Sequence, residues 1–171
     1  MHWTDRRQNF RAVLEGDRCV YPASVHDPIS ARIAEELGFE IGMLAGSIAS
    51  FTVLGNPDLI LLTLIEFAQQ AYRINSAGKL PLMVDADHGY GNALNVMRTI
   101  RELETARVAA ILIEDTSLPA SFGETKSRLI SIEEGIGKMR AALAAREDPS
   151  LIVIGRTAAA AITGIEEAIA R

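Results

Sequence analysis

Residues 82–114 read LMVDADHGYGNALNVMRTIRELETARVAAILIE, and the pattern of this stretch indicates the fold class. It contains two short apolar runs, residues 82–84 and 110–113, which flank a segment with helical spacing. Asn92 can cap that segment at its start. The apolar residues of its inner face are Val96, Met97, Ile100 and Leu103. The stretch therefore predicts a strand, a helix and a second strand.

The same alternation extends through the rest of the chain. Further apolar runs occupy residues 19–23, 41–45 and 151–154, and a helix that presents Phe10, Val13 and Leu14 on one face precedes them. The runs are apolar at odd and even positions alike, which is typical of strands buried on both faces of a parallel sheet. We therefore expect one helix followed by five strand-then-helix units.

Local signals mark the ends of the intervening helices. Asp27 followed by Pro28 predicts a helix start, and Gly38 is placed to end that helix. A Ser or Thr followed three positions later by Glu predicts a capping box. This pattern occurs at Thr63 and Glu66, at Ser131 and Glu134, and at Thr163 and Glu166.

Composition limits the class of protein. The 171 residues are 49% apolar and 23% charged with a net charge of −5, which is ordinary for a globular domain and argues against nucleic-acid binding. No apolar run reaches the roughly 18 residues of a membrane span, and the polar N-terminus lacks the apolar core of a signal peptide. We therefore expect a cytoplasmic protein without membrane or nucleic-acid partners.

Cysteine usage excludes two further classes of protein. Cys19 is the single cysteine, so the chain cannot build a disulfide scaffold or a cysteine-rich zinc site. We expect Cys19 to be a small core residue.

Two α/β folds fit this pattern: an open doubly wound sheet and a (β/α)8 barrel. Periodicity does not separate them. A complete barrel takes about 250 residues, so five of its eight units suit this length. The chain also ends in IEEAIAR, inside a helical pattern without a stop signal. We therefore expect residues 1–171 to be a single domain that is an incomplete part of a larger fold.

Polar residues follow the apolar runs at the point where each predicted strand ends. Asp85 and Asp87 follow the third run, Glu114 and Asp115 the fourth, and Arg156 the fifth. The carboxyl ends of parallel strands meet on one rim, where α/β proteins place their sites. Asp85 and Asp87 are two positions apart, which on a strand directs them to the same side.

Carboxylates that converge at one rim repel one another unless a cation joins them. Oxygen ligands favour Mg²⁺, with Mn²⁺ as an alternative. A helix cap is the competing interpretation for Asp87 or Asp115 alone. Arg156 can bind a substrate carboxylate through two parallel hydrogen bonds, and its competing role is a salt bridge to Asp85 or Glu114.

Weaker candidates lie nearby. Gly46 and Ser47 follow the second run, in a strand-to-loop turn whose backbone N–H groups can hold an anion. A lone histidine such as His88 is more often structural than catalytic. Ser24 has no identifiable histidine partner, so a serine triad is unsupported.

Five stretches together resemble the isocitrate lyase/phosphoenolpyruvate mutase superfamily, and within it the bacterial oxaloacetate decarboxylase family. They are SVHDPISARIAEELGFE (24–40), GMLAGSIAS (42–50), VDADHGYGNALNVMRTIRELE (84–104), AAILIEDTSLPASFG (109–123) and VIGRT (153–157). The resemblance implies a (β/α)8 barrel with an eighth helix swapped between subunits, and a homotetramer built as a dimer of dimers. It also implies Mg²⁺ as cofactor and a small α-keto acid as substrate.

The resemblance assigns roles residue by residue. Asp85 is the principal metal residue, and Asp87, Glu114 and Asp58 of the N-P-D segment hold the water shell of the ion. Gly46 and Ser47 contact the substrate carboxylate. Arg156 also contacts substrate and is the catalytic residue. The implied reaction is the decarboxylation of oxaloacetate to pyruvate and CO₂ through a metal-stabilised enolate.

Departures from the superfamily pattern narrow the reaction. Lyases of the superfamily carry a Lys-x-Cys-Gly-His motif after the fourth strand, whereas residues 119–123 read PASFG here. Ala158 also stands where an Asn or Asp is usual, and the stretch that supplies a later substrate-contacting histidine is absent. Two alternatives remain: another C–C lyase acting on a related 2-oxo acid or substituted malate, and a non-catalytic fragment that binds metal and carboxylates.

Overall fold

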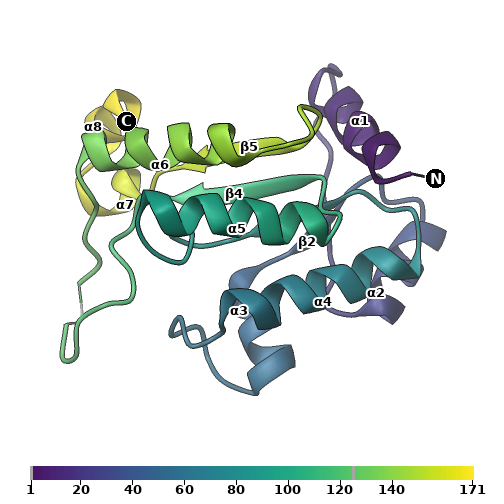
Figure 1. Cartoon of the computed structure of the whole chain (residues 1–171), viewed down its shortest axis with the longest axis horizontal. Coiled ribbons are helices and arrows are strands. Elements are labelled where there is room, and N and C mark those ends of the chain that lie inside the picture. Colours follow the sequence, from purple (N-terminus) through teal and green to yellow (C-terminus); the bar gives the residue numbers. More distant parts are fainter. Residues whose placement is uncertain (1, 125) are drawn as a thin grey trace.

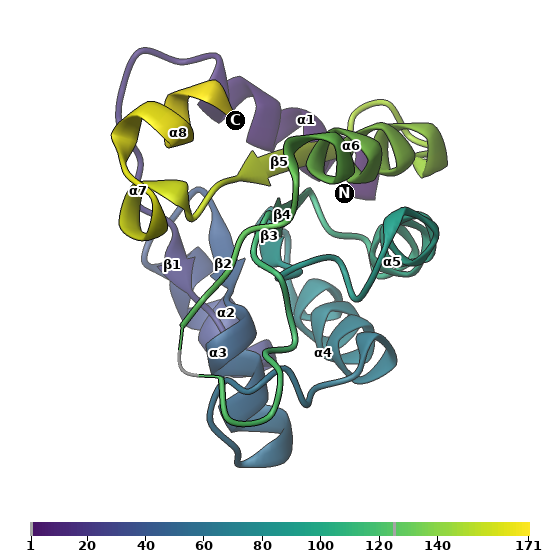
Figure 2. The same cartoon turned by 90° about the vertical axis from the view of Figure 1, so that its left-hand side faces the viewer.

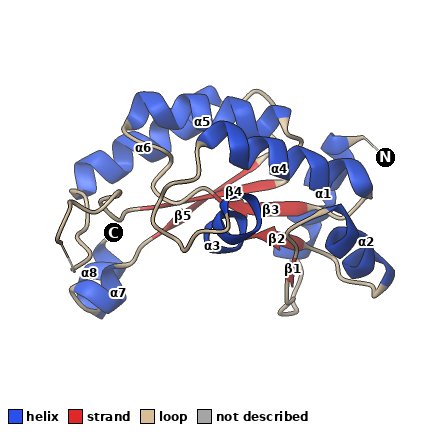
Figure 3. Ribbon diagram, turned by 90° about the horizontal axis from the view of Figure 1, so that it is seen from below, coloured by secondary structure: helices blue, strands red, loops and turns tan. Residues whose placement is uncertain are grey.

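A computed structural model describes residues 2–124 and 126–171. Its sheet contains β1 (Ala23–Ser24), β2 (Gly42–Leu44), β3 (Leu82–Asp85), β4 (Ala110–Glu114) and β5 (Ile152–Arg156). All neighbouring strands in this part of the chain are parallel and follow one another in chain order, β1-β2-β3-β4-β5. Figure 1 labels β2, β4 and β5, and Figure 3 labels all five strands. A doubly wound sheet reverses its strand order at a switch point, and this sheet has no reversal. The sequential order is that of consecutive units of a β/α barrel.

Helices follow the strands as the alternating pattern predicts. The long helices are α1 (Trp3–Leu14), α2 (Pro28–Glu36), α4 (Leu64–Ala77), α5 (Ala93–Thr105) and α6 (Ile132–Ala145). The short ones are α3 (Gly46–Ala49), the π-helical η1 (Ser50–Leu54), α7 (Ala159–Ile162) and α8 (Ile165–Ala170). Helices α2, α4, α5 and α6 contact one another in that order, and Figures 2 and 3 show α4, α5 and α6 along one face of the sheet.

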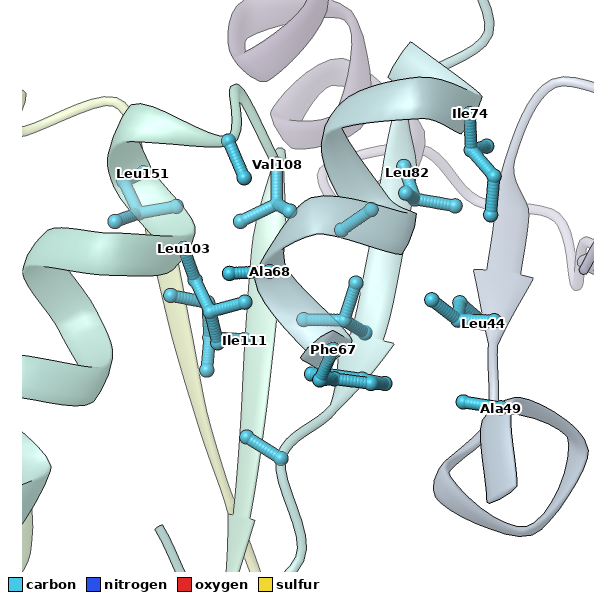
Figure 4. Packing of buried hydrophobic residues seen from close by; sticks show 14 of the residues in the cluster. Leu44, Ala49, Phe67, Ala68, Ile74, Leu82, Leu103, Val108, Ile111 and Leu151 are labelled. Carbon is cyan, nitrogen blue, oxygen red and sulfur yellow. The ribbon is translucent and has the colours of Figure 1, made fainter. Parts of the chain in front are cut away.

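The main core lies between this layer of helices and the sheet. Phe67 of α4, Leu103 of α5, Leu82 of β3 and Ile111 of β4 are fully or almost fully buried there (Figure 4). No helix of the described residues is long and apolar enough to cross a membrane.

Most of the helix starts form as predicted. Asp27 accepts a hydrogen bond of 2.7 Å from the Ser30 amide, and Asn92 caps the first turn of α5. The capping box of Thr63 and Glu66 is present. Only half of the box predicted at Ser131 and Glu134 forms: the Ser131 hydroxyl accepts from the Glu134 amide and caps α6. The predicted box at Thr163 is wrong, because α8 begins after Gly164 without a side-chain cap. The Thr163 hydroxyl instead donates to the Ala159 carbonyl in the last turn of α7.

The first predicted strand is mostly wrong. Pairing with β2 begins only where the Ala23 amide donates to the Ile41 carbonyl, so residues 19–22 are not a strand. Pro22 has no N–H to donate, which explains the late start. Cys19 is exposed, which corrects the expectation of a small core residue.

Helix α1 packs on the amino ends of the strands. Phe10 lies in a small cluster with Ile41, Ala110 and Ile152. Arg7 is 1% exposed, and its guanidinium donates to the Val108 carbonyl at 3.0 Å and to Asp148 at 2.7 Å. This end of the sheet therefore holds structural contacts, and the opposite rim carries the candidate site.

Candidate active site

Asp85 and Asp87 come together through a turn. Asp85 is the last residue of β3 and is buried. Asp87 lies beyond the strand with a φ of 48°, so strand alternation does not explain its direction and that part of our prediction is wrong. The Asp87 amide nevertheless donates to the Asp85 carboxylate at 3.1 Å. The turn folds back and keeps the two acidic residues at the same rim.

Gly46 allows the Asp87 carboxylate to approach the end of β2. A Cβ atom at position 46 would lie 2.8 Å from one carboxylate oxygen of Asp87 and 2.9 Å from the other. No real side chain fits at those distances, so the close approach requires glycine. Ser47 follows it, exposed, in the first turn of α3. The expected strand-to-loop turn is thus the start of a short helix at this rim.

Arg156 lies between two carboxylates that come from different strands. Its guanidinium is 3.2 Å from the Asp85 carboxylate and 3.5 Å from that of Glu114. Glu114 is the register partner of Arg156 on the neighbouring strand. The two carboxylates are about one-tenth exposed, whereas the Arg156 side chain is 49% exposed. The salt bridges that we considered as its competing role are present, and half of the side chain still faces solvent.

Burial and mutual repulsion perturb the acidic residues. Burial first, and then the charges of Asp85 and Asp58, raise the pKa of Asp87 to about 7. Burial also raises the pKa of Asp85, although the Asp87 amide and Arg156 act in the opposite direction. Asp58 is exposed in the loop before α4, yet its charge acts on both groups. The single positive charge of Arg156 therefore does not balance the surrounding carboxylates.

The donor set suits a hydrated divalent cation. Throughout residues 2–124 and 126–171, no three His, Cys, Asp or Glu side chains are grouped so that they could hold a metal ion together. Mg²⁺ usually keeps several waters and takes only one or two protein carboxylates. The oxygen-only chemistry and the unbalanced negative charge therefore fit an ion that is bound partly through water.

Asp115 is occupied by structural contacts. Its carboxylate accepts hydrogen bonds from the Thr157 hydroxyl at 2.6 Å and from the Ala158 amide at 3.0 Å. Arg171 donates to it at 3.3 Å. Asp115 thus holds the turn between β5 and α7, but it is not a helix N-cap, because the N-cap of α6 is Ser131 and that of α7 is Ala158. Sequence reasoning did not foresee this link, because Thr157 alone carries no distinctive signal.

His88 is buried in the same turn as Asp87. Burial, together with the nearby Lys138 charge, lowers the pKa of its imidazole to about 4. Its backbone carbonyl accepts a hydrogen bond from Lys138, which is also buried. A neutral buried ring agrees with the structural role expected for His88.

A separate cavity of about 470 Å³ borders the cluster on the side of α6. Glu114 and Arg156 contribute to its wall, but Asp85 and Asp87 do not. Much of the remaining lining is apolar, including Ile130, Ile132 and Ile136. Because the acidic pair is absent from its wall, we place the candidate site at the rim and not in this cavity.

Comparisons with known proteins identify the family of the chain. The family model described as phosphoenolpyruvate phosphomutase matches residues 10–171. An oxaloacetate decarboxylase of Rhodopseudomonas palustris (strain BisB18) is 60% identical over all 171 residues, and the chain spans 59% of its length.

Solved structures show the same architecture. Phosphoenolpyruvate phosphomutase from Streptomyces platensis subsp. rosaceus has a TM-score of 0.88 at 35% identity, over 96% of this chain and 58% of that one. A phosphonopyruvate hydrolase complex with oxalate and Mg²⁺ has a TM-score of 0.85 at 33% identity, over 96% and 57%.

Proposed function

Because the chain belongs to the phosphoenolpyruvate phosphomutase family, we propose that the protein containing it decarboxylates oxaloacetate to pyruvate and CO₂. The observation that carries the proposal is the cluster of Asp85, Glu114 and Arg156 at one rim, in a chain 60% identical to a relative named oxaloacetate decarboxylase. The chain spans less than two thirds of that relative, so the activity is proposed for the whole protein that contains it.

We assign the acidic residues to a divalent cation, Mg²⁺ or Mn²⁺. Asp85 would bind it directly, and Asp87, Glu114 and Asp58 would accept hydrogen bonds from its water ligands. When bound, such an ion supplies electron withdrawal from the keto group of the substrate. The similar structure of phosphonopyruvate hydrolase, a complex with oxalate and Mg²⁺, supports this assignment by analogy.

Arg156 and the end of β2 would orient the substrate. Loss of CO₂ from the far carboxylate leaves the enolate of pyruvate, which carries more charge on its oxygen than the ketone did. A proton taken up at the methylene carbon then gives pyruvate. The half-exposed guanidinium of Arg156 can stabilise that charge. Ser47, with the backbone of Gly46, would hold the carboxylate next to the keto group from the other side.

The loop after β4 disfavours isocitrate and methylisocitrate chemistry. Residues 119–123, PASFG, contain no thiol or imidazole, and Phe122 is fully exposed. A lyase that protonates its departing product through this loop would need such a group. Turnover of a related 2-oxo acid or substituted malate remains the alternative reaction, and metal binding without turnover is the alternative outside catalysis.

We further propose that the protein works in the cytoplasm as a homo-oligomer, a dimer of dimers, with a small α-keto acid as its partner. The acidic net charge of −5 supports neither a nucleic-acid nor a membrane-surface partner.

The test is pyruvate release by the whole protein, followed by NMR with oxaloacetate and with a panel of 2-oxo acids and substituted malates. Divalent ions decarboxylate oxaloacetate in solution, so the rate without protein at the same Mg²⁺ concentration is subtracted. We expect oxaloacetate to be the best substrate and EDTA to abolish the enzymatic rate. Faster turnover of another panel member would replace oxaloacetate, and metal binding without turnover would support the non-catalytic alternative.

A further inference from the structure

The turn that carries Asp87 has an unfavourable backbone. Asp87 and Tyr90 have φ angles of 48° and 63°, and Gly89 and Gly91 are also left-handed. Residues other than glycine rarely adopt this conformation, because their Cβ atom crowds the backbone. Such a turn keeps its shape only when the surrounding structure fixes it. The contacts of residues 86–91 therefore decide where the Asp87 carboxylate lies.

Three consecutive carbonyl groups of the turn are held by donors from three different elements. The carbonyl of Asp87 accepts from the Glu114 amide of β4 at 2.7 Å. That of His88 accepts from the Lys138 ammonium of α6 at 3.0 Å. That of Gly89 accepts from the hydroxyl of Thr99 on α5, also at 3.0 Å. Two of the three donors are side chains, and both are buried.

Lys138 is the unusual donor. It is 3% exposed and lies one helical turn before the fully buried Ala142, on the face of α6 that packs inward. Burying an ammonium group is unfavourable unless a polar group receives it. The His88 carbonyl receives it here, and the charge of Glu134, one turn earlier on α6, also favours the ammonium. An apolar side chain would fill this position without that penalty. The presence of a lysine here therefore indicates that its hydrogen bond to the turn has a role.

We propose that Lys138 is a positioning residue for the metal and substrate site. It holds the His88 carbonyl, fixes the left-handed turn, and so keeps the Asp87 carboxylate beside Gly46 and Asp85. Thr99 fixes the next carbonyl in the same way. Neither residue touches the reacting atoms. The inference rests on the proposed function for its effect on catalysis, but its effect on the turn and on metal binding stands apart from any one reaction.

The test compares Lys138→Met, Lys138→Arg and the control Arg140→Met, which removes an exposed cation from the same helix. Binding of Mn²⁺ alone is measured by electron paramagnetic resonance, and hydrogen exchange is measured for the amides of residues 86–91. We expect Lys138→Met to bind Mn²⁺ about tenfold or more weakly and to exchange these amides faster. Lys138→Arg should recover part of both, and Arg140→Met should change neither.

Kinetics with oxaloacetate add a readout that depends on the proposed function. Lys138→Met should lower kcat more than it raises KM, because a misplaced carboxylate weakens the transition state more than substrate capture. If oxaloacetate is not a substrate, this readout fails for the parent too, while Mn²⁺ binding and exchange still test the positioning role.

The inference is overturned if Lys138→Met folds with the parent's melting temperature and keeps both its Mn²⁺ affinity and the slow exchange of residues 86–91. If that variant does not fold, Thr99→Val decides in its place. It removes the donor to the Gly89 carbonyl with little change of shape, and the exposed Thr105→Val is its control. Parent-like Mn²⁺ binding and exchange in Thr99→Val would show that side-chain donors to the carbonyls of this turn do not position Asp87, and would then overturn the inference.

Discussion

Arg156 at the end of β5 donates a hydrogen bond of 3.2 Å to Asp85 at the end of β3, reaching across the strand between them. That middle strand, β4, contributes Glu114, which lies 3.5 Å from the same guanidinium. Three consecutive strands thus meet through one side chain. Because Arg156 is half exposed while both carboxylates are nearly buried, it can bind an incoming anion without leaving the cluster.

Arg156→Lys should cripple the enzyme without unfolding it. A lysine carries a point charge and cannot reproduce the fork that binds a carboxylate and stabilises an enolate oxygen. We expect kcat/KM for oxaloacetate to fall about 100-fold or more, which corresponds to roughly 3 kcal/mol. Arg140→Lys, on the exposed side of α6, should keep the parent's kcat/KM. A parent-like rate for Arg156→Lys would leave the arginine with a purely structural role.

Gly46→Ala should displace the Asp87 carboxylate. The added methyl group would lie within 3 Å of both carboxylate oxygens, so either the turn or α3 must move. We expect weaker Mn²⁺ binding, by about tenfold. Gly137→Ala is the matched control, because nothing lies within 4 Å of a Cβ at that helical position. Isothermal titration with Mn²⁺ should separate the two variants, and equal affinities would show that the close approach at Gly46 has no bearing on the ion.

Stability at acidic pH should depend on Asp148. Burial acts to raise the pKa of this carboxyl, but hydrogen bonds from Ser150, Arg7 and Thr4 outweigh it and hold the pKa well below its usual value. The unfolded chain therefore binds more protons than the folded chain as the pH falls below about 4. The stability that Asp148 contributes is present above that pH and is lost progressively below it.

The corresponding variant is Asp148→Asn, with the exposed Asp17→Asn as control. Near pH 7 we expect Asp148→Asn to lose about 2 kcal/mol of unfolding free energy, since the buried Arg7 loses its nearer charged partner, at 2.7 Å, and keeps only Glu104 at 3.5 Å. Below pH 4 its stability should fall less steeply than the parent's. Urea titrations between pH 3 and pH 7 measure both effects, and parallel pH curves for parent and variant would contradict the assignment.

Isocitrate should not be cleaved. The loop after β4 offers no thiol or imidazole to protonate a departing product, as residues 119–123 show. We expect no glyoxylate or succinate above the buffer level when the whole protein is incubated with isocitrate and Mg²⁺. Release of glyoxylate at a rate comparable with pyruvate release from oxaloacetate would refute this reading of the loop.

Much of the architecture can be predicted from local chemistry. The five apolar runs and the caps at Asp27, Thr63 and Asn92 predict the alternation of strands and helices, and placing Asp85, Glu114 and Arg156 after strands predicts that they share a rim. Strand order, which excludes the doubly wound alternative, depends on pairing between distant segments. It came only from the resemblance and from the structure.

The features that the sequence predicted wrongly or not at all have physical causes. Residues 19–22 are apolar enough for a strand, but Pro22 cannot donate to the ladder and the run stays outside it. Strand periodicity fails at Asp87 because its backbone is left-handed, with a φ of 48°, and no longer extended. The burial of Lys138 was not predicted, because a lysine on a helix is usually solvated. Its spacing of four from Ala142, on the buried face, is the signal that could have identified it.

Pyruvate release by Asp85→Asn, measured over a series of Mg²⁺ concentrations, is the decisive test of Asp85 as a ligand of a metal ion that the reaction requires. Asparagine keeps the size of the side chain but removes the charge that we assign to the ion. After subtraction of the rate without protein, the parent should show saturable activation by Mg²⁺. Asp85→Asn, with circular dichroism confirming its fold, should stay at the background rate throughout. A variant with the parent's rate and the parent's Mg²⁺ dependence would contradict the account.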